Sequence, residues 1–297
     1  MMNNNKSYLY QLLKDSLYYS FSKIIPGLAG LISIIIFFRL IGAEEYGKYS
    51  IIFSFTNLIA AFSFGWLNQS MLRYRSKYSS TKKIMNPISL GLIFGTIPLI
   101  IFVIITSAIE FPLVFSFKHI IFLALSIGLF NIVKSTFQSE ELPNKVILIT
   151  SYQSILMIVC SVIILKLYDN SAEGIILGIS LGYILPILPY SKLFSSKVIT
   201  KKNIKKIKPF FNYGAPLSIW LGISLSLNFL DRYFIEYYYG SSLMGSYAGL
   251  SEFIIRIFSI VIFPITLALH PILINKWNKN KNIYDFFIKL FKASAIQ

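Results

Sequence analysis

Long runs of apolar residues, separated by short polar segments, are the main pattern along the chain. A run of about 20 apolar residues is long enough to cross the hydrocarbon core of a bilayer as an α-helix. Eight such runs can be placed, at residues 17–38, 49–67, 88–109, 120–137, 146–165, 174–193, 213–230 and 247–274. A last segment, 284–297, begins another apolar pattern. The pattern therefore predicts an all-α polytopic membrane protein with about eight transmembrane helices.

The composition strengthens this prediction. Of the 297 residues, 55% are hydrophobic and only 13% are charged, whereas a soluble domain carries about a quarter charged residues. The mean hydropathy is +0.66. The first apolar run is too long for a cleavable signal peptide, and no small-residue cleavage site follows it. We therefore expect this run to be the first transmembrane helix.

The distribution of charge predicts the orientation. With the N-terminus, the even-numbered loops and the C-terminus on one side, that side holds 21 Lys and Arg residues and four acids. The other side holds five basic residues and eight acids. Because basic residues concentrate on the cytoplasmic side of a membrane, both termini are expected to be cytoplasmic. The net charge of +16 is therefore an orientation signal, and no nucleic-acid partner is expected.

Chemistry-bearing residues are scarce. The one cysteine, Cys160, lies in an apolar run, which excludes a disulfide within the chain. The two histidines, His119 and His270, have no carboxylates at ligand spacing, so no metal site is expected. The outward loops are short and leave no extracytoplasmic domain for catalysis. We therefore expect no catalytic residues and no cofactor, and a protein that is not an enzyme.

A short motif occurs twice, each time after an odd-numbered span. Both copies read Gly-x4-Gly-x-Tyr and lie 198 residues apart: Gly42, Gly47 and Tyr49 in the first, Gly240, Gly245 and Tyr247 in the second. Parallel internal repeats are typical of transporters. The offset equals six helices and a linker. It divides the chain into a six-helix lobe (1–194), a basic cytoplasmic linker (195–212) and an incomplete second lobe (213–297).

Small residues recur every four positions in two of the spans. Gly174, Gly178 and Gly182 lie in the sixth span, and Gly91 and Gly95 lie in the third. Small residues at this spacing let helix backbones approach closely. Packing within the chain is the expected use, and homodimerisation is the alternative.

Charged residues inside the spans are the sharpest functional signal, because they are costly there and usually face a cavity or a partner. Lys23 lies in the first span, where snorkelling to the interface and a cavity role are equally good interpretations. Asp231 and Arg232 follow the seventh span and are candidates for a structural ion-pair latch, together with Glu252. Arg256 is the best candidate for an anionic headgroup, since guanidinium matches phosphate geometry.

Two segments resemble a known family. They are FFRLIGAEEYGKYSIIFSF at 37–55 and YGAPLSIWLGISLSLNFLDRYFIEYYYGSSLMGSYAGL at 213–250. Both resemble polysaccharide flippases of the multidrug/oligosaccharidyl-lipid/polysaccharide exporter superfamily. The resemblance implies two six-helix lobes around a central cavity. It also implies that the chain, with eight spans against twelve or more, is C-terminally truncated.

The resemblance further implies a function. Such proteins move undecaprenyl-diphosphate-linked oligosaccharide, such as an O-antigen repeat unit for lipopolysaccharide biosynthesis, across the bacterial cytoplasmic (inner) membrane by alternating access. Cationic cavity positions on the first, second and eighth helices would contact the diphosphate, which points to Lys23 and Arg256 here. The expected partners are the lipid-linked oligosaccharide, membrane lipids and other polysaccharide-assembly proteins.

Two other functions remain open on the sequence. A membrane-embedded polysaccharide polymerase or glycosyltransferase would be expected to carry a sizeable polar loop with clustered Arg, Asp or Glu, and the outward loops are short. A small-molecule exporter of the same superfamily would favour buried carboxylates in the first lobe. None is evident in the interior of the first six spans.

Overall fold

The computed structural model describes residues 2–108, 117–194 and 200–278, with side chains described from 24 to 260 except 103, 106–116, 195–199, 201 and 202. The described residues form helices and no strand. In chain order the elements are α1 (Met2–Tyr74), the 3-10 helix η1 (Arg75–Lys77), α2 (Thr81–Ala108), α3 (Phe117–Ser139), α4 (Pro143–Leu167), α5 (Ala172–Ile184), the 3-10 helix η2 (Leu185–Leu193) and α6 (Lys201–Asn278). Six of the described helical stretches are long and apolar enough to cross a bilayer. The prediction of an all-α polytopic membrane protein is confirmed.

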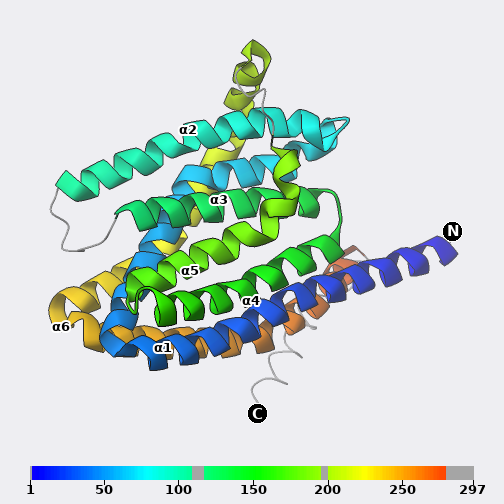
Figure 1. The fold of residues 1–297 in the computed structure, drawn as a ribbon. Coiled ribbons are helices and arrows are strands. Elements are labelled where there is room, and N and C mark those ends of the chain that lie inside the picture. The colour runs from blue at the N-terminus through cyan, green and yellow to red at the C-terminus, as the bar shows by residue number, and fades with distance from the viewer. Residues whose placement is uncertain (1, 109–116, 195–199, 279–297) are drawn as a thin grey trace, which may run out of the picture.

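Two of these helices are far longer than one crossing. Each is interrupted at one glycine with non-helical backbone angles, Gly42 in α1 and Gly240 in α6. The chain reverses at each glycine, so α1 has a first arm (2–41) and a second arm (43–74), and α6 has a first arm (201–239) and a second arm (241–278). Both reversals lie at the same end of the bundle (Figure 1). With two arms each, six helices account for the eight predicted spans.

The helices extend beyond the apolar runs that predicted them. The polar residues Glu44, Glu45 and Lys48 were expected in a loop, but they form the first turns of the second arm of α1. Residues 201–212, within the predicted linker, are the start of α6. The reason is that backbone hydrogen bonding continues past the membrane boundary wherever no residue stops it. Hydropathy marks the bilayer and not the end of the helix.

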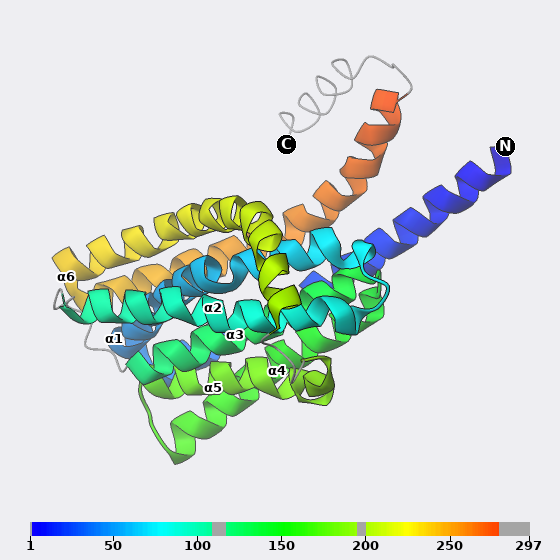
Figure 2. The same cartoon turned by 90° about the horizontal axis from the view of Figure 1, so that it is seen from above.

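The second arm of α1 forms the centre of the bundle. Helices α2, α3 and α5 lie on one side of it and α6 on the other, as the two perpendicular views show (Figures 1 and 2). Phe64 on this arm is 1% exposed. Its ring lies between Gly95 of α2 and Gly128 of α3, where an added methyl group would come within 2.7 Å of the ring. Close packing around small residues, and not a hydrophobic driving force, holds membrane helices together.

The glycine stripe of α5 packs against α4. A methyl group on Gly178 would overlap the backbone of Ser161, and one on Gly182 would lie 2.6 Å from the Cα of Met157. The two helices therefore approach backbone to backbone over this stretch. The predicted use of these glycines, packing within the chain, is confirmed.

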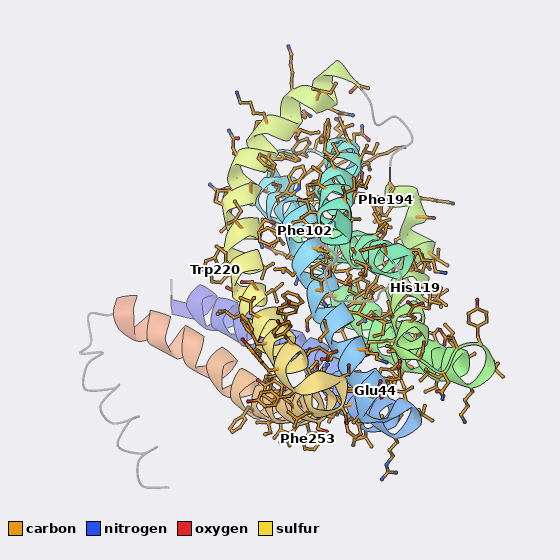
Figure 3. All side chains as sticks on the ribbon, turned by 90° about the vertical axis from the view of Figure 1, so that its left-hand side faces the viewer. Glu44, Phe102, His119, Phe194, Trp220 and Phe253 are labelled. Carbon is orange, nitrogen blue, oxygen red and sulfur yellow. The ribbon has the colours of Figure 1, made fainter. Side chains whose placement is uncertain are left out.

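The second arm of α1 and the first arm of α6 pack along their length. Ser218 Oγ donates to the carbonyl oxygen of Ala61 at 2.5 Å, and Ser70 Oγ donates to that of Phe210 at 2.7 Å. On the outer side of α6, Trp220 points away from the bundle and is 69% exposed (Figure 3). The two arms therefore form one continuous interface between the two repeats, with the outer face of α6 left open.

Polar contacts tie the ends of the helices opposite the two reversals. Arg75 after α1 forms an ion pair with Glu140 after α3 at 2.9 Å, and Thr81 at the start of α2 also donates to Glu140. Partial burial raises the pKa of Glu140, but the hydrogen bonds from Thr81 and Arg75 outweigh it and leave that pKa below its ordinary value. This carboxylate therefore joins three helix ends in its charged form.

Candidate functional site

The two repeat motifs form matching reversals. Gly42 has φ 77° and ψ 176°, and Gly240 has φ 80° and ψ 169°. This region of backbone conformation is accessible to essentially no residue but glycine. Glycine at the first position of each motif is therefore what allows a helix to reverse without a loop.

The second glycines of the motifs face each other. A methyl group on Gly47 would overlap the carbonyl oxygen of Ser241, and one on Gly245 would overlap that of Ala43. Ala43 and Ser241 are themselves separated by the repeat offset of 198. The contact is therefore reciprocal, as it would be across a two-fold axis.

The tyrosines of the motifs have different surroundings. Tyr49 is 6% exposed, and its ring lies edge-on to that of Phe37 with centroids 6.0 Å apart. Tyr247 is 38% exposed and donates a hydrogen bond to Asp231 at 2.9 Å. The repeat is thus close in backbone geometry at the reversals but not in every side-chain contact.

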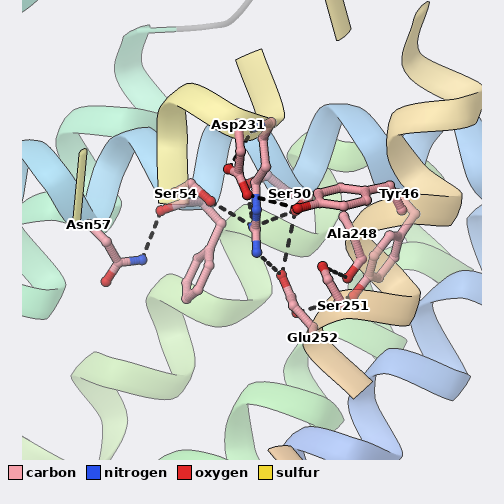
Figure 4. A network of polar contacts seen from close by, with 11 residues as sticks. Tyr46, Ser50, Ser54, Asn57, Asp231, Ala248, Ser251 and Glu252 are labelled. Carbon is pink, nitrogen blue, oxygen red and sulfur yellow. Dashed lines mark hydrogen bonds and ion pairs between the residues drawn. The ribbon is translucent and has the colours of Figure 1, made fainter. Parts of the chain in front are cut away.

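Below the reversals, Arg232 is the centre of a polar network. Its guanidinium forms an ion pair with Glu252 at 2.9 Å and donates to Ser54 Oγ at 2.6 Å and to the carbonyl oxygen of Ser50 at 3.2 Å. Tyr46 donates to the other carboxylate oxygen of Glu252 at 3.3 Å. Ser50, Ser54, Tyr46 and Glu252 converge from α1 and α6 in Figure 4. The network thus joins both arms of α6 to the second arm of α1.

Of the three ion-pair candidates Asp231, Arg232 and Glu252, the structure pairs Arg232 with Glu252. Asp231 instead accepts hydrogen bonds from Tyr247 and from the backbone N–H of Arg232, and the Arg232 side chain turns to Glu252. Both residues were expected after the seventh span, but α6 continues past them to Gly240. Arg232 therefore points into the interface between the repeats, where its side chain is 11% exposed.

A cavity of about 350 Å³ lies beside this network. Its apolar walls are Phe53, Leu225 and Ile255. Its polar lining comes from the second arm of α1 and both arms of α6: Ser54, Asn57, Asn228, Arg232, Glu252 and Arg256. With two guanidinium groups and one carboxylate, the lining carries one excess positive charge.

Arg256 differs from Arg232 in its charged partners. Within the part of the chain whose side chains are described, no ion pair to Arg256 is found, because Glu252 one turn earlier is engaged by Arg232. Arg256 is partly buried, and it lines the cavity between α1 and α6. The guanidinium therefore faces the interior of the bundle. It could bind an anion there by paired N–H donors.

The other sequence candidates are placed as follows. Lys23 belongs to α1, but its side chain lies outside the described residues. Asn228 on the first arm of α6 also lines the cavity. Sequence reasoning missed Ser54 and Asn57. Their spacing of three residues on one helix face was the available signal.

No group of three or more His, Cys, Asp and Glu side chains that could hold a metal ion is found in the described part of the chain. The lining residues make the site a polar, cationic cavity between two halves of a repeat. It offers guanidinium N–H donors to an anion, with amide and hydroxyl groups close by.

A sequence model of the family described as "Polysaccharide biosynthesis protein" matches residues 12–276. The match includes both repeat motifs and every residue that lines the cavity. Comparisons with curated proteins and with solved structures gave no match.

Proposed function

Because the chain belongs to the polysaccharide biosynthesis protein family, whose model matches most of its length, we propose that it moves undecaprenyl-diphosphate-linked oligosaccharide across the bacterial cytoplasmic membrane. The family suggests a role in polysaccharide synthesis or export, and the helices are those of a multi-pass membrane protein. In this proposal the cargo is an O-antigen or related repeat unit. The protein acts by alternating access, not as an enzyme, with the lobes 1–194 and 213–297 on the two sides of the cavity.

The observation that supports this proposal most is the unbalanced guanidinium of Arg256. It lies nine residues after the start of the predicted span at 247, which is about 14 Å along the helix and so near the middle of a bilayer core of about 30 Å. A charged residue at this depth costs about 2.5–3.5 kcal/mol on insertion scales. A diphosphate headgroup would supply the negative charge that the described part of the protein does not provide.

The cavity also suits the sugar next to the diphosphate. Asn57, Asn228 and Ser54 are uncharged polar groups beside the cation. The Asn57 side-chain nitrogen donates to the carbonyl oxygen of Phe53 at 2.8 Å, which leaves its oxygen as an acceptor for a sugar hydroxyl. In this arrangement the anion is held by charge and the first sugar by hydrogen bonds.

Orientation forms part of the same proposal. Both termini are cytoplasmic, and the reversals at Gly42 and Gly240 face the periplasm. Reporter fusions at residues 80 and 170 test this assignment. A reporter that requires the cytoplasm should be active at residue 80 and inactive at residue 170, and the opposite pattern would reverse the assignment.

The function is tested in bacterial cells that lack their own flippase and express this chain. The wild-type chain should restore surface polysaccharide, Arg256→Ala should abolish it, and Arg256→Lys should restore it in part. The matched control is Arg39→Ala, which removes an exposed arginine near the same reversals. Normal polysaccharide display by the Arg256→Ala variant, at equal amounts of protein in the membrane, would refute the role of Arg256.

A further inference from the structure

The Arg256 guanidinium occupies a space that exists only because Gly30 has no side chain. A methyl group at Gly30, on the first arm of α1, would overlap the guanidinium and would lie 3.0 Å from its Nε atom. One turn earlier, a methyl group at Gly27 would touch only the Ile260 side chain, at 3.1 Å. Gly30 therefore forms a notch in α1 that receives Arg256, and Gly27 does not.

The wall of this notch is held in place on both sides. Ser33 is 4% exposed, and its hydroxyl donates to the carbonyl oxygen of Gly30 at 2.7 Å. The ring of Phe38 packs on α6 within 3.3 Å of where a methyl group on Gly249 would lie, and Gly27 packs against Ile260. The first arm of α1 is thus in contact with α6 on either side of Gly30. A side chain at Gly30 would therefore displace Arg256 more readily than the backbone.

The notch orients the Arg256 side chain, as an ion pair and hydrogen bonds orient Arg232 elsewhere in the site. Arg232 is oriented by Glu252, Ser50 and Ser54, whereas among the described side chains the contact that positions the Arg256 guanidinium is its packing against Gly30. A long arginine side chain samples many rotamers, and ordering it on binding lowers affinity. A guanidinium that is already ordered in a fixed notch avoids most of that loss.

We propose that Gly30 is a positioning residue for the anion site, because the notch it forms holds the Arg256 guanidinium at the edge of the cavity. This inference rests on the proposed function, in which Arg256 binds the diphosphate. It assigns to the first arm of α1 a role that depends on Gly30 having no side chain.

The test measures binding of undecaprenyl diphosphate to the purified full-length chain in detergent micelles, by titration in native mass spectrometry. Gly30→Ala should weaken binding about threefold to tenfold, while Gly27→Ala should leave it unchanged. Arg256→Gln should weaken binding by at least about tenfold. Undecaprenol, which lacks phosphate, should bind all variants equally weakly.

A double-mutant cycle separates positioning from general helix packing. If Gly30 acts through Arg256, Gly30→Ala should have no further effect in the Arg256→Gln background. It should also have little effect in the Arg256→Lys background, since a slender ammonium group needs no notch. Thermal unfolding of each variant in the same detergent shows whether the fold is retained. If Gly30→Ala lowers stability, the comparison of Arg256→Lys with and without Gly30→Ala still tests the inference, because a general packing defect would weaken binding in that background too.

Three results would overturn the inference. An unchanged affinity in Gly30→Ala, an equal loss in Gly27→Ala, or an undiminished loss in the Arg256→Gln background would each show that the notch does not position Arg256. If Arg256→Gln itself binds as tightly as the wild type, the diphosphate role in the proposed function fails as well. If Arg256→Gln weakens binding as expected but Gly30→Ala does not, the inference about Gly30 fails and the proposed function stands.

Discussion

Replacing Glu252 with alanine would leave the Arg232 guanidinium without its counter-charge inside the bundle. The pair is joined at 2.9 Å, and the two side chains are 11% and 14% exposed. Removing one partner of a buried ion pair typically destabilises a protein by about 3–5 kcal/mol, because the other charge remains buried. Arg232 would keep its contacts to Ser50 and Ser54, so we expect the lower end of that range.

Other substitutions of the pair should rank in a definite order. Glu252→Gln keeps an acceptor oxygen but removes the charge, and we expect a loss of about 1–2 kcal/mol. Replacing both Arg232 and Glu252 with leucine removes both charges, so the double variant should be destabilised far less than the sum of the single leucine variants. A matched control is Glu44→Ala, which removes an exposed partner of Lys48 and should change stability by less than about 1 kcal/mol.

The assay is equilibrium unfolding of the purified chain in mixed detergent micelles with increasing SDS, followed by tryptophan fluorescence. A coupling energy of about 2 kcal/mol or more between Arg232 and Glu252 is expected from the double-mutant cycle. The reasoning would be refuted if Glu252→Ala is no more destabilising than Glu44→Ala. It would also be refuted if the effects of the two single leucine variants simply add.

Two further predictions concern the reversals and the helix ends. Gly42→Ala and Gly240→Ala should each destabilise the fold by about 1–3 kcal/mol in the same unfolding assay through backbone strain, because, apart from the adjacent residues, no described atom lies within 4 Å of either added methyl group. Gly249→Ala, at a helical glycine, should cost less, and equal effects would contradict this account. The lowered pKa of Glu140 means that its contribution to stability is complete above its ordinary pKa of 4.5 and is lost as the pH falls through the lowered value. Unfolding measured from about pH 3 to pH 7 should therefore show a weaker acid dependence in Glu140→Gln than in the wild type, and identical profiles would exclude this role.

The membrane-spanning segments could be predicted from the sequence because a bilayer core requires about 20 apolar residues for each crossing. The ends of the helices could not be predicted in this way, since the polar residues around Gly42 and Gly240 form the same helical backbone hydrogen bonds as apolar residues do. A glycine motif signalled both reversals. Nothing in the motif distinguished a short loop from a kink within one continuous helix.

The polar residues of the site were only partly predictable, for a different reason. Arg232 has Asp231 beside it in the sequence, and Arg256 has Glu252 one helical turn away. Spacing alone therefore favours two local pairs. The fold instead brings Glu252 to Arg232 across the reversal, a choice set by tertiary packing. The relation between Gly30 and Arg256 connects opposite ends of the chain, and no local pattern indicates it.

The reciprocal contact between Gly47 and Gly245 has a mechanical consequence. Equivalent points of the two repeats touch there, so the contact lies close to the axis that relates them, and a rotation about a point near it would move these residues least. Displacement then grows with distance along the arms. Arg256 lies 11 residues beyond Gly245, which is about 16 Å along the helix, so a rotation of about 10° would carry it about 3 Å. A small rotation at the reversals would therefore move the guanidinium far enough to bind an anion in one position and release it in the other.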